Sequence, residues 1–159
     1  MLHIYILCVG KLKEQYLKDA CLEYQKRLSK YCHIDLIELP DEKIPDKINE
    51  KIALEIKEQE CKRILVNIPK DSYVISLDLK GKQFSSEEFS EKIESISFIN
   101  SSITFIIGGS LGLTNSILQR SNELICFSKM TFPHQLIRVF LLEQIYRAFK
   151  ISHNESYHK

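Results

Sequence analysis

The strongest indication of a binding site is a group of glycines that directly follows a short apolar run. The run covers residues 102–107 and leads into Gly108, Gly109 and, after two further residues, Gly112. Glycine permits positive φ angles and lets a ligand approach the backbone closely, and ligands bind at the carboxyl ends of strands in open α/β sheets. The GGxxG spacing matches neither the dinucleotide fingerprint nor the phosphate-binding P-loop. A tight turn that serves only packing is the alternative interpretation.

A second candidate is the segment that links the next predicted strand to the last predicted helix. It consists of Phe127, Ser128, Lys129, Met130, Thr131, Phe132, Pro133 and His134. Two loops at one edge of a sheet can form two walls of a pocket, and free backbone amides and carbonyls in the longer loop suit the edge of an adenine. His134 is a plausible proton acceptor near neutral pH, although a histidine at the start of a helix is as often only a polar contact there.

The chain ends in SHNESYHK, residues 152–159, which brings a phenol, imidazoles and an amine together. Tyr157, His158 and Lys159 are side chains that contact phosphate or stack on a nucleobase. Chain ends are usually disordered, so a frayed end is the alternative. We expect no metal ion, because the sequence has no HExxH motif and its five cysteines are not paired at short spacing. Hydrolytic chemistry has little support, since no Ser-His-Asp order is present.

These candidate segments belong to a chain that alternates strand and helix patterns. We expect strands over residues 3–9, 34–39, 73–79, 102–107 and 123–127, and helices over 12–31, 45–68, 85–96, 113–121 and 133–151. A capping box at Ser85 and Glu88 marks the start of one helix. The alternation predicts one α/β domain over 1–159, with a mostly parallel sheet flanked by helices.

The last predicted helix is apolar around most of its circumference, which is typical of a buried helix. Its apolar residues are Leu136, Ile137, Val139, Phe140, Leu141, Leu142, Ile145, Tyr146, Ala148 and Phe149. In so small a domain a subunit interface is a natural place for such a helix, and we therefore expect a homodimer. Burial inside one chain is the alternative.

Charge argues against one class of protein. The net charge is +1, whereas domains that grip naked nucleic acid by charge alone are usually strongly basic. Residues 117–159 carry a net +3 and residues 1–116 a net −2, so a polyanion would meet the C-terminal quarter, unless this imbalance is chance. No apolar run approaches the roughly 20 residues of a membrane span. The odd number of cysteines, without a signal peptide, indicates a cytoplasmic protein.

Several segments together resemble the RlmH methyltransferases of the SPOUT superfamily. The resemblance lies in VGKLK at 9–13, IIGGS at 106–110 with Gly112, FSKMTFPH at 127–134, LEQIYRA at 142–148 and the closing Tyr157-His158. It runs over the whole chain in order. Lys159 departs from members that carry arginine at this position, which would remove a bidentate contact.

The resemblance implies a SPOUT-type fold with a deep C-terminal trefoil knot, a homodimer and a defined reaction. The knot and the cofactor site would lie within about 73–151, followed by a tail over 152–159. The reaction would transfer a methyl group from S-adenosylmethionine to N3 of a pseudouridine in the helix 69 loop of 23S ribosomal RNA. The substrate would be the assembled ribosome.

The resemblance also implies roles for individual residues. Cofactor-binding residues would be Leu77, Gly108, Gly109, Gly112, Phe127, Ser128, Lys129, Met130, Thr131 and Phe132. RNA contacts would come from Tyr157, His158, Lys159 and Arg138, and the tail would serve its own or the partner subunit's site. Tyr157, His158 and His134 are the candidates for catalysis.

A sulfonium methyl group is already activated, so the enzyme needs neither a metal nor a covalent nucleophile. Positioning of the reacting atoms and stabilisation of developing charge would supply the rate. His158, His134 or solvent would accept the N3 proton. A non-catalytic nucleotide- or RNA-binding module that uses the same glycine-lined pocket is the alternative function.

Overall fold

The computed structural model describes residues 1–158, in which five strands and five helices alternate strictly. The strands are β1 (His3–Val9), β2 (His33–Leu39), β3 (Tyr73–Lys82), β4 (Ser102–Ile107) and β5 (Glu123–Ile125). The helices are α1 (Gln15–Leu28), α2 (Glu50–Asn67), α3 (Ser86–Ser97), α4 (Asn115–Arg120) and α5 (His134–Ser152). The predicted α/β fold with a sheet flanked by helices is therefore confirmed.

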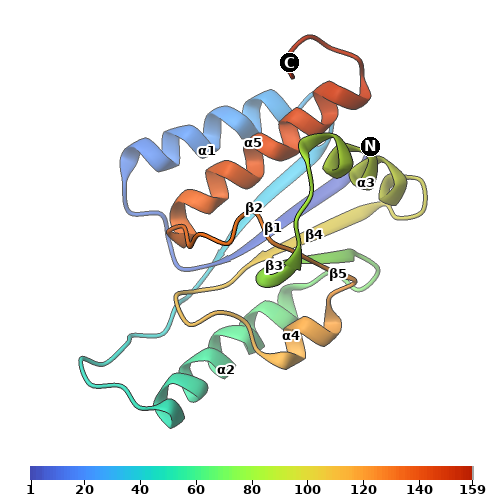
Figure 1. Cartoon of the computed structure of the whole chain (residues 1–159). Helices are drawn as coiled ribbons and strands as arrows, with labels where there is room; N and C mark the ends of the chain where they lie inside the picture. The colour runs from blue at the N-terminus through green and yellow to red at the C-terminus, as the bar shows by residue number, and fades with distance from the viewer. Residues whose placement is uncertain (159) are drawn as a thin grey trace.

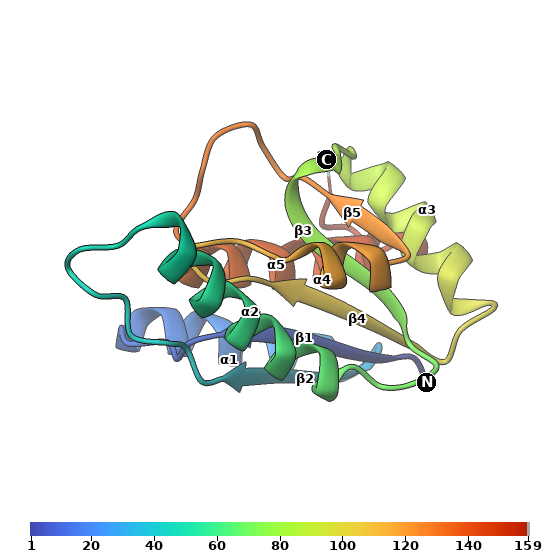
Figure 2. The same ribbon diagram turned by 90° about the horizontal axis from the view of Figure 1, so that it is seen from below.

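All five strands lie parallel in the order β2-β1-β4-β3-β5. Helices α1, α3 and α5 cover one face of the sheet, and α2 and α4 cover the other (Figures 1 and 2). Because all five strands are parallel, the loops that follow β1, β3, β4 and β5 lie at one edge of the sheet, where open α/β sheets bind ligands.

Strand β1 shows why the sheet needs helices on both faces. Side chains alternate between faces along a strand, so Ile4 and Ile6 pack beneath α1 and α5, whereas Leu7 and Val9 pack against α2 and α4. Both sets are almost completely buried. A strand buried on both faces reads as an unbroken apolar run, as β1 does.

Two helices begin later than predicted, because polar side chains bond to backbone amides near their starts. The helix expected from residue 45 begins at Glu50, because the Asn49 side chain caps it by accepting from the Ile52 amide at 2.9 Å. The helix expected from residue 12 begins at Gln15, since the Leu12 amide donates to Glu38 at 2.6 Å instead. The predicted capping box of Ser85 and Glu88 is confirmed.

Helix α5 is buried largely by its own chain. Leu141, Leu142 and Ile145 are fully buried between the sheet and the neighbouring helices α1 and α3. Only part of the apolar surface of α5 is exposed to solvent, including that of Phe140, which is 39% exposed. The alternative of burial within one chain thus accounts for most of this helix, and its composition alone no longer argues strongly for a dimer.

Candidate functional site

A cavity of about 420 Å³ lies between the second half of β3 and the segments that follow β4 and β5. Its wall contains all the residues predicted to hold a cofactor except Lys129. These are Leu77, Gly108, Gly109, Gly112, Phe127, Ser128, Met130, Thr131 and Phe132. The sequence did not predict the remaining wall residues, Asp78, Leu79, Lys80, Ile107, Ser110, Leu113, Ile125, Cys126 and Ile137. Residues from the segments 107–113 and 125–132 therefore line one pocket, as expected for two loops at one sheet edge.

The glycines of the β4–α4 loop are needed for different reasons. A Cβ on Gly108 would lie 2.9 Å from Leu113 Cδ2, and one on Gly109 would lie 2.9 Å from Glu60 Oε1. Gly112 has open space around it but a φ of +82°, and its amide donates to the Gly109 carbonyl at 3.1 Å. Packing and a tight turn thus explain the glycines, and the same turn leaves the loop backbone on the cavity wall.

Replacing Gly112 should weaken cofactor binding through backbone conformation. A β-branched residue in the left-handed region costs about 1–2 kcal/mol, so Gly112→Val should shift the loop and reduce affinity roughly 5- to 30-fold. Gly112→Asn is the matched control, because asparagine tolerates this region. Titration calorimetry with S-adenosylmethionine compares the two. Equal loss in both variants, or unchanged affinity in the valine variant, would contradict this account.

Glu60 of α2 supports the glycine loop from behind. It is 5% exposed, and its carboxylate accepts from the Glu42 amide at 3.1 Å while facing Gly109. Burial raises the pKa of this carboxyl above its usual range, and the nearby Asp41 adds to the rise. Glu60 lies in a helix rich in Lys and Glu, and its neighbours in the sequence give no indication of this contact.

Gly81 shapes the opposite wall. Strand β3 has an irregularity between Leu77 and Lys82, both of which pair with Ile125. A Cβ on Gly81 would lie 2.5 Å from the carbonyl carbon of Ile125, so only glycine fits there. The Cys126 amide then donates to the Lys82 carbonyl at 3.0 Å, directly before the cofactor loop. The glycine in the KGK run at 80–82, just after the predicted strand, is the sequence signal for this close approach.

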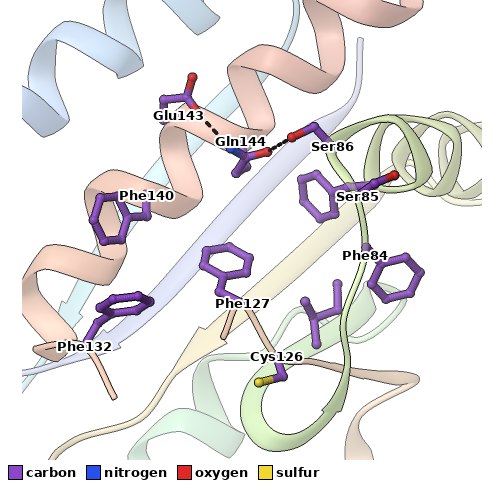
Figure 3. Close-up of a pocket in the computed structure, with 11 residues that line it drawn as sticks. Phe84, Ser85, Ser86, Cys126, Phe127, Phe132, Phe140, Glu143 and Gln144 are labelled. Carbon is purple, nitrogen blue, oxygen red and sulfur yellow. Dashed lines mark hydrogen bonds between the residues drawn. The ribbon is translucent and has the colours of Figure 1, made fainter. Parts of the chain in front are cut away.

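A second, aromatic cavity of about 280 Å³ adjoins the first and shares Phe127 and Phe132 with it. Figure 3 shows Phe127, Phe132 and Phe140 turned toward a common space beside helix α5. At its far side the Ser86 hydroxyl donates to Gln144 at 2.7 Å, and the Gln144 amide donates to Glu143 at 2.9 Å. Phe132 and Phe140 meet edge to face with ring centroids 5.5 Å apart.

His134 lies in the wall of the first cavity, at the start of α5. Burial lowers the pKa of its imidazole below the ordinary value, and the positive charge of Arg138 lowers it further, while Asp41 acts in the opposite direction. A lowered pKa leaves the imidazole neutral at pH 7 and free to accept a proton. The geometry is thus compatible with both interpretations made from the sequence.

Arg138 holds a different place from the one expected. It is fully buried, and its guanidinium donates to Glu38 at 2.9 Å and to the carbonyls of Val9 and Gly10 at 3.1 and 2.9 Å. Glu38 also accepts from the Leu12 amide. The predicted RNA contact is therefore corrected: Arg138 ties the first turns of α5 to the end of β1, and its side chain has no exposed surface for RNA.

The tail is folded, and residues 153–158 do not form a frayed end. Tyr157 packs edge-on against Tyr146 at 5.0 Å and donates to Glu143 at 3.2 Å. His158 Nδ1 accepts from Arg147 at 3.0 Å, and its Nε2 lies 2.6 Å from a Glu87 carboxylate oxygen. An arginine can only donate, so these partners suit the neutral imidazole with its proton on Nε2. Lys159 lies outside the described residues.

Tyr157 and His158 do not line the first cavity. Glu143, the partner of Tyr157, lines the aromatic cavity instead. Burial raises the pKa of Tyr157 to about 12, with the negative charge of Glu143 as the next cause. At neutral pH this phenol is thus a hydrogen-bond donor. The structure brings His134, but not the tail, to the predicted cofactor residues.

The match to known families agrees with this geometry. Residues 2–158 match the family model described as a predicted SPOUT methyltransferase. The chain belongs to the SPOUT methyltransferase family. A solved structure described as a probable methylase family protein from Haemophilus influenzae shares this SPOUT fold, with a TM-score of 0.55 over 98% of this chain and 70% of that one, at 15% identity.

Curated SPOUT relatives are similar over their full length. The Ribosomal RNA large subunit methyltransferase H of Clostridium acetobutylicum is 60% identical over 159 residues, covering 99% of this chain and 100% of the relative. A protein of the same name from Clostridium novyi is 55% identical with the same coverage. Within residues 1–158, no three His, Cys, Asp or Glu side chains cluster as a metal site requires, and no helix has the length and apolar character to cross a membrane.

Proposed function

We propose that this SPOUT methyltransferase transfers a methyl group from S-adenosylmethionine to large-subunit ribosomal RNA. The observation that carries the proposal is the cavity between the glycine loop after β4 and the loop after β5, which is lined by all the predicted cofactor residues except Lys129. The name shared by the relatives supports ribosomal RNA as the substrate. The finer target, N3 of a pseudouridine in the helix 69 loop of 23S RNA in assembled ribosomes, rests on the sequence resemblance.

The residues present fit such a cofactor. A volume of about 420 Å³ is within the range of small-molecule sites. Leu77 and Ile137 offer apolar contact, and the glycine loop offers backbone at close range. When bound, the cofactor supplies an activated methyl group on sulfur, so the residues here need only hold, orient and shield it.

His134 is our first candidate for the N3 proton, because it lies in the cavity wall and its pKa is lowered by burial. Tyr157 is a poorer acceptor, since its raised pKa keeps the phenol protonated. We assign Tyr157 and His158 to orienting the RNA base and to stabilising charge that develops on it. Lys159 would add a phosphate contact.

A homodimer is part of the proposal, with each chain one domain over 1–159 that contains the family's knot within about 73–151. Tyr157 and His158 lie outside the cofactor cavity of their own chain, so a second chain's tail is one way to complete the site. We expect sedimentation at micromolar concentration to give a dimer. A stable monomer that is fully active would contradict this part.

The deciding experiment offers cofactor with a labelled methyl group to assembled ribosomes that lack the modification and, separately, to free ribosomal RNA. We expect label at one pseudouridine of the ribosome and little on free RNA. Label on neither, together with intact cofactor binding, would favour the non-catalytic binding module. Label mainly on free RNA would overturn only the assembled-ribosome part. Because ribosomes are the substrate, we place the protein in the cytoplasm.

A further inference from the structure

We propose that Glu155 is a positioning residue that fixes the direction in which Tyr157 and His158 leave helix α5. The proposal rests on the proposed function, in which those two residues act on the RNA. In this proposal the tail has an anchored part, centred on Glu155, and a tip, Tyr157 and His158, that exchanges its contacts when RNA binds. Three independent features of the chain carry it: the helix end, the carboxylate partners and the contacts of the tip.

The helix end forces the chain to turn at a defined residue. Asn154 adopts φ 53°, in the left-handed region. The Asn154 amide donates to Ile151 at 3.0 Å and the Glu155 amide donates to Lys150 at 2.9 Å. This pair of bonds is a Schellman motif with asparagine at the left-handed position. The reversal therefore sends Glu155 and the following residues back along the helix.

The Glu155 carboxylate then joins two helices. Its Oε2 accepts from the Tyr31 hydroxyl at 2.7 Å and lies 3.3 Å from Lys30 Nζ, both just beyond α1, and it is also paired with Lys150 of α5. Tyr31 is itself held by a stacked contact with Phe149, with ring centroids 5.4 Å apart and planes 7° apart. A carboxylate with three donors on two elements has little freedom to move.

The charge of Glu155 is secure at physiological pH. The Lys150 ammonium, then the Tyr31 hydroxyl, lowers the pKa of Glu155 to about 2. Because its pKa is depressed in the folded chain, this anchor is fully present above the ordinary glutamate range and is lost only as the pH falls toward 2. The anchor is therefore constant across the conditions in which ribosomes work.

The tip has contacts of another kind. His158 pairs with Glu87, whose side chain is 58% exposed, and Arg147 covers one face of the Tyr157 ring at 4.7 Å. RNA phosphates and bases can replace an exposed carboxylate and a guanidinium, whereas none of the Glu155 partners belongs to the tip. Anchoring at Glu155 limits the conformations that residues 157 and 158 must lose when they reach the target nucleobase. This lowers the entropic part of the activation barrier.

The test compares Glu155→Gln and Glu155→Ala with Glu94→Gln, an exposed carboxylate on α3 that serves as the control for loss of charge. We expect kcat on ribosomes to fall on the order of 10- to 100-fold in both Glu155 variants, as for a small misplacement of reacting groups. The Kd for S-adenosylmethionine should match that of Glu94→Gln, and the Tm should lie only slightly lower, because exposed ion pairs contribute little to stability. Hydrogen exchange should show faster exchange at residues 156–158.

Tyr31→Phe supplies a second, independent variant. If Glu155 acts through Tyr31, the losses in kcat from Tyr31→Phe and Glu155→Gln should be less than additive in the double variant. Wild-type kcat in Glu155→Ala, or a parallel loss of Tm and cofactor affinity, would overturn the proposal. If the wild-type protein labels no RNA, the proposed function fails. The anchor is refuted separately if hydrogen exchange at residues 156–158 is unchanged in the Glu155 variants.

Discussion

Removing residues 155–159 should abolish methyl transfer and leave the fold and cofactor binding intact. The deleted segment contains Tyr157 and His158, which we assign to the RNA, and of its described residues, 155–158, none lines the cofactor cavity. Its contacts to α1, α3 and α5 are on the outside of the helical layer, apart from the ring of Tyr157 against Tyr146. Label transfer to ribosomes, calorimetry with the cofactor and a thermal melt measure the three properties.

Single substitutions divide this effect between the two side chains. Tyr157→Phe removes the hydroxyl that donates to Glu143 but keeps the ring, and His158→Gln keeps polar atoms but removes the imidazole. We expect each to reduce kcat and neither to change cofactor affinity. Full activity in the truncated chain would mean that the tail only covers α5 and that the RNA is met elsewhere.

Arg138→Met should destabilise the protein by about 3 kcal/mol, near the low end for a broken buried ion pair. Arg138 is fully buried, whereas Glu38 is 32% exposed and regains some water when its partner is lost. The carbonyls of Val9 and Gly10 also lose their donor, and a buried acceptor without a partner is costly. Urea unfolding followed by circular dichroism measures the change.

Arg27→Met is the matched control, because Arg27 forms a solvent-exposed ion pair with Glu23 on α1. Exposed pairs contribute little, so its unfolding curve should overlay that of the wild type. If Arg138→Met does not fold, Glu38→Gln removes the same charge pair and should also lose stability, because the buried Arg138 guanidinium then has no counter-charge. Equal stability of the Arg138 and Arg27 variants would show that the buried guanidinium is not needed.

Arg138→Met should also weaken cofactor binding. Arg138 fastens the first turns of α5, and His134 and Ile137 of those turns line the cofactor cavity. A looser helix start leaves the preceding loop without a fixed end. One buried side chain thus connects the stability of the sheet with the shape of the functional site.

Local patterns were enough for the order of elements and for much of the cavity wall. The apolar run of β4 followed by Gly108 and Gly109, and the strand-to-helix segment after β5, correctly predicted two walls of one pocket. Such predictions succeed because the carboxyl ends of parallel strands necessarily share an edge. Gly81 and Glu60 were not predicted, since their roles depend on Ile125 and Gly109, which are distant in sequence.

Charge and chain position proved less informative than packing. The resemblance implied an RNA contact for Arg138, which lies in the basic C-terminal quarter, but the fold places it against the ends of β1 and β2. The tail was open to interpretation as a frayed end, although Asn154 before Glu155 is compatible with the Schellman turn that orders it. The position of the tail depends on bonds to Lys30 and Tyr31, which lie more than a hundred residues earlier in the sequence.

The sequence by itself determined the parallel α/β layering, the glycine loop and the family, because periodicity and short motifs act over neighbouring residues. Only the tertiary structure decided which charges are buried, which glycines are irreplaceable and where the tail lies. Those properties depend on which distant segments come into contact. A pattern read along the chain records a side chain's type, whereas its partners set its burial, its pKa and hence its role.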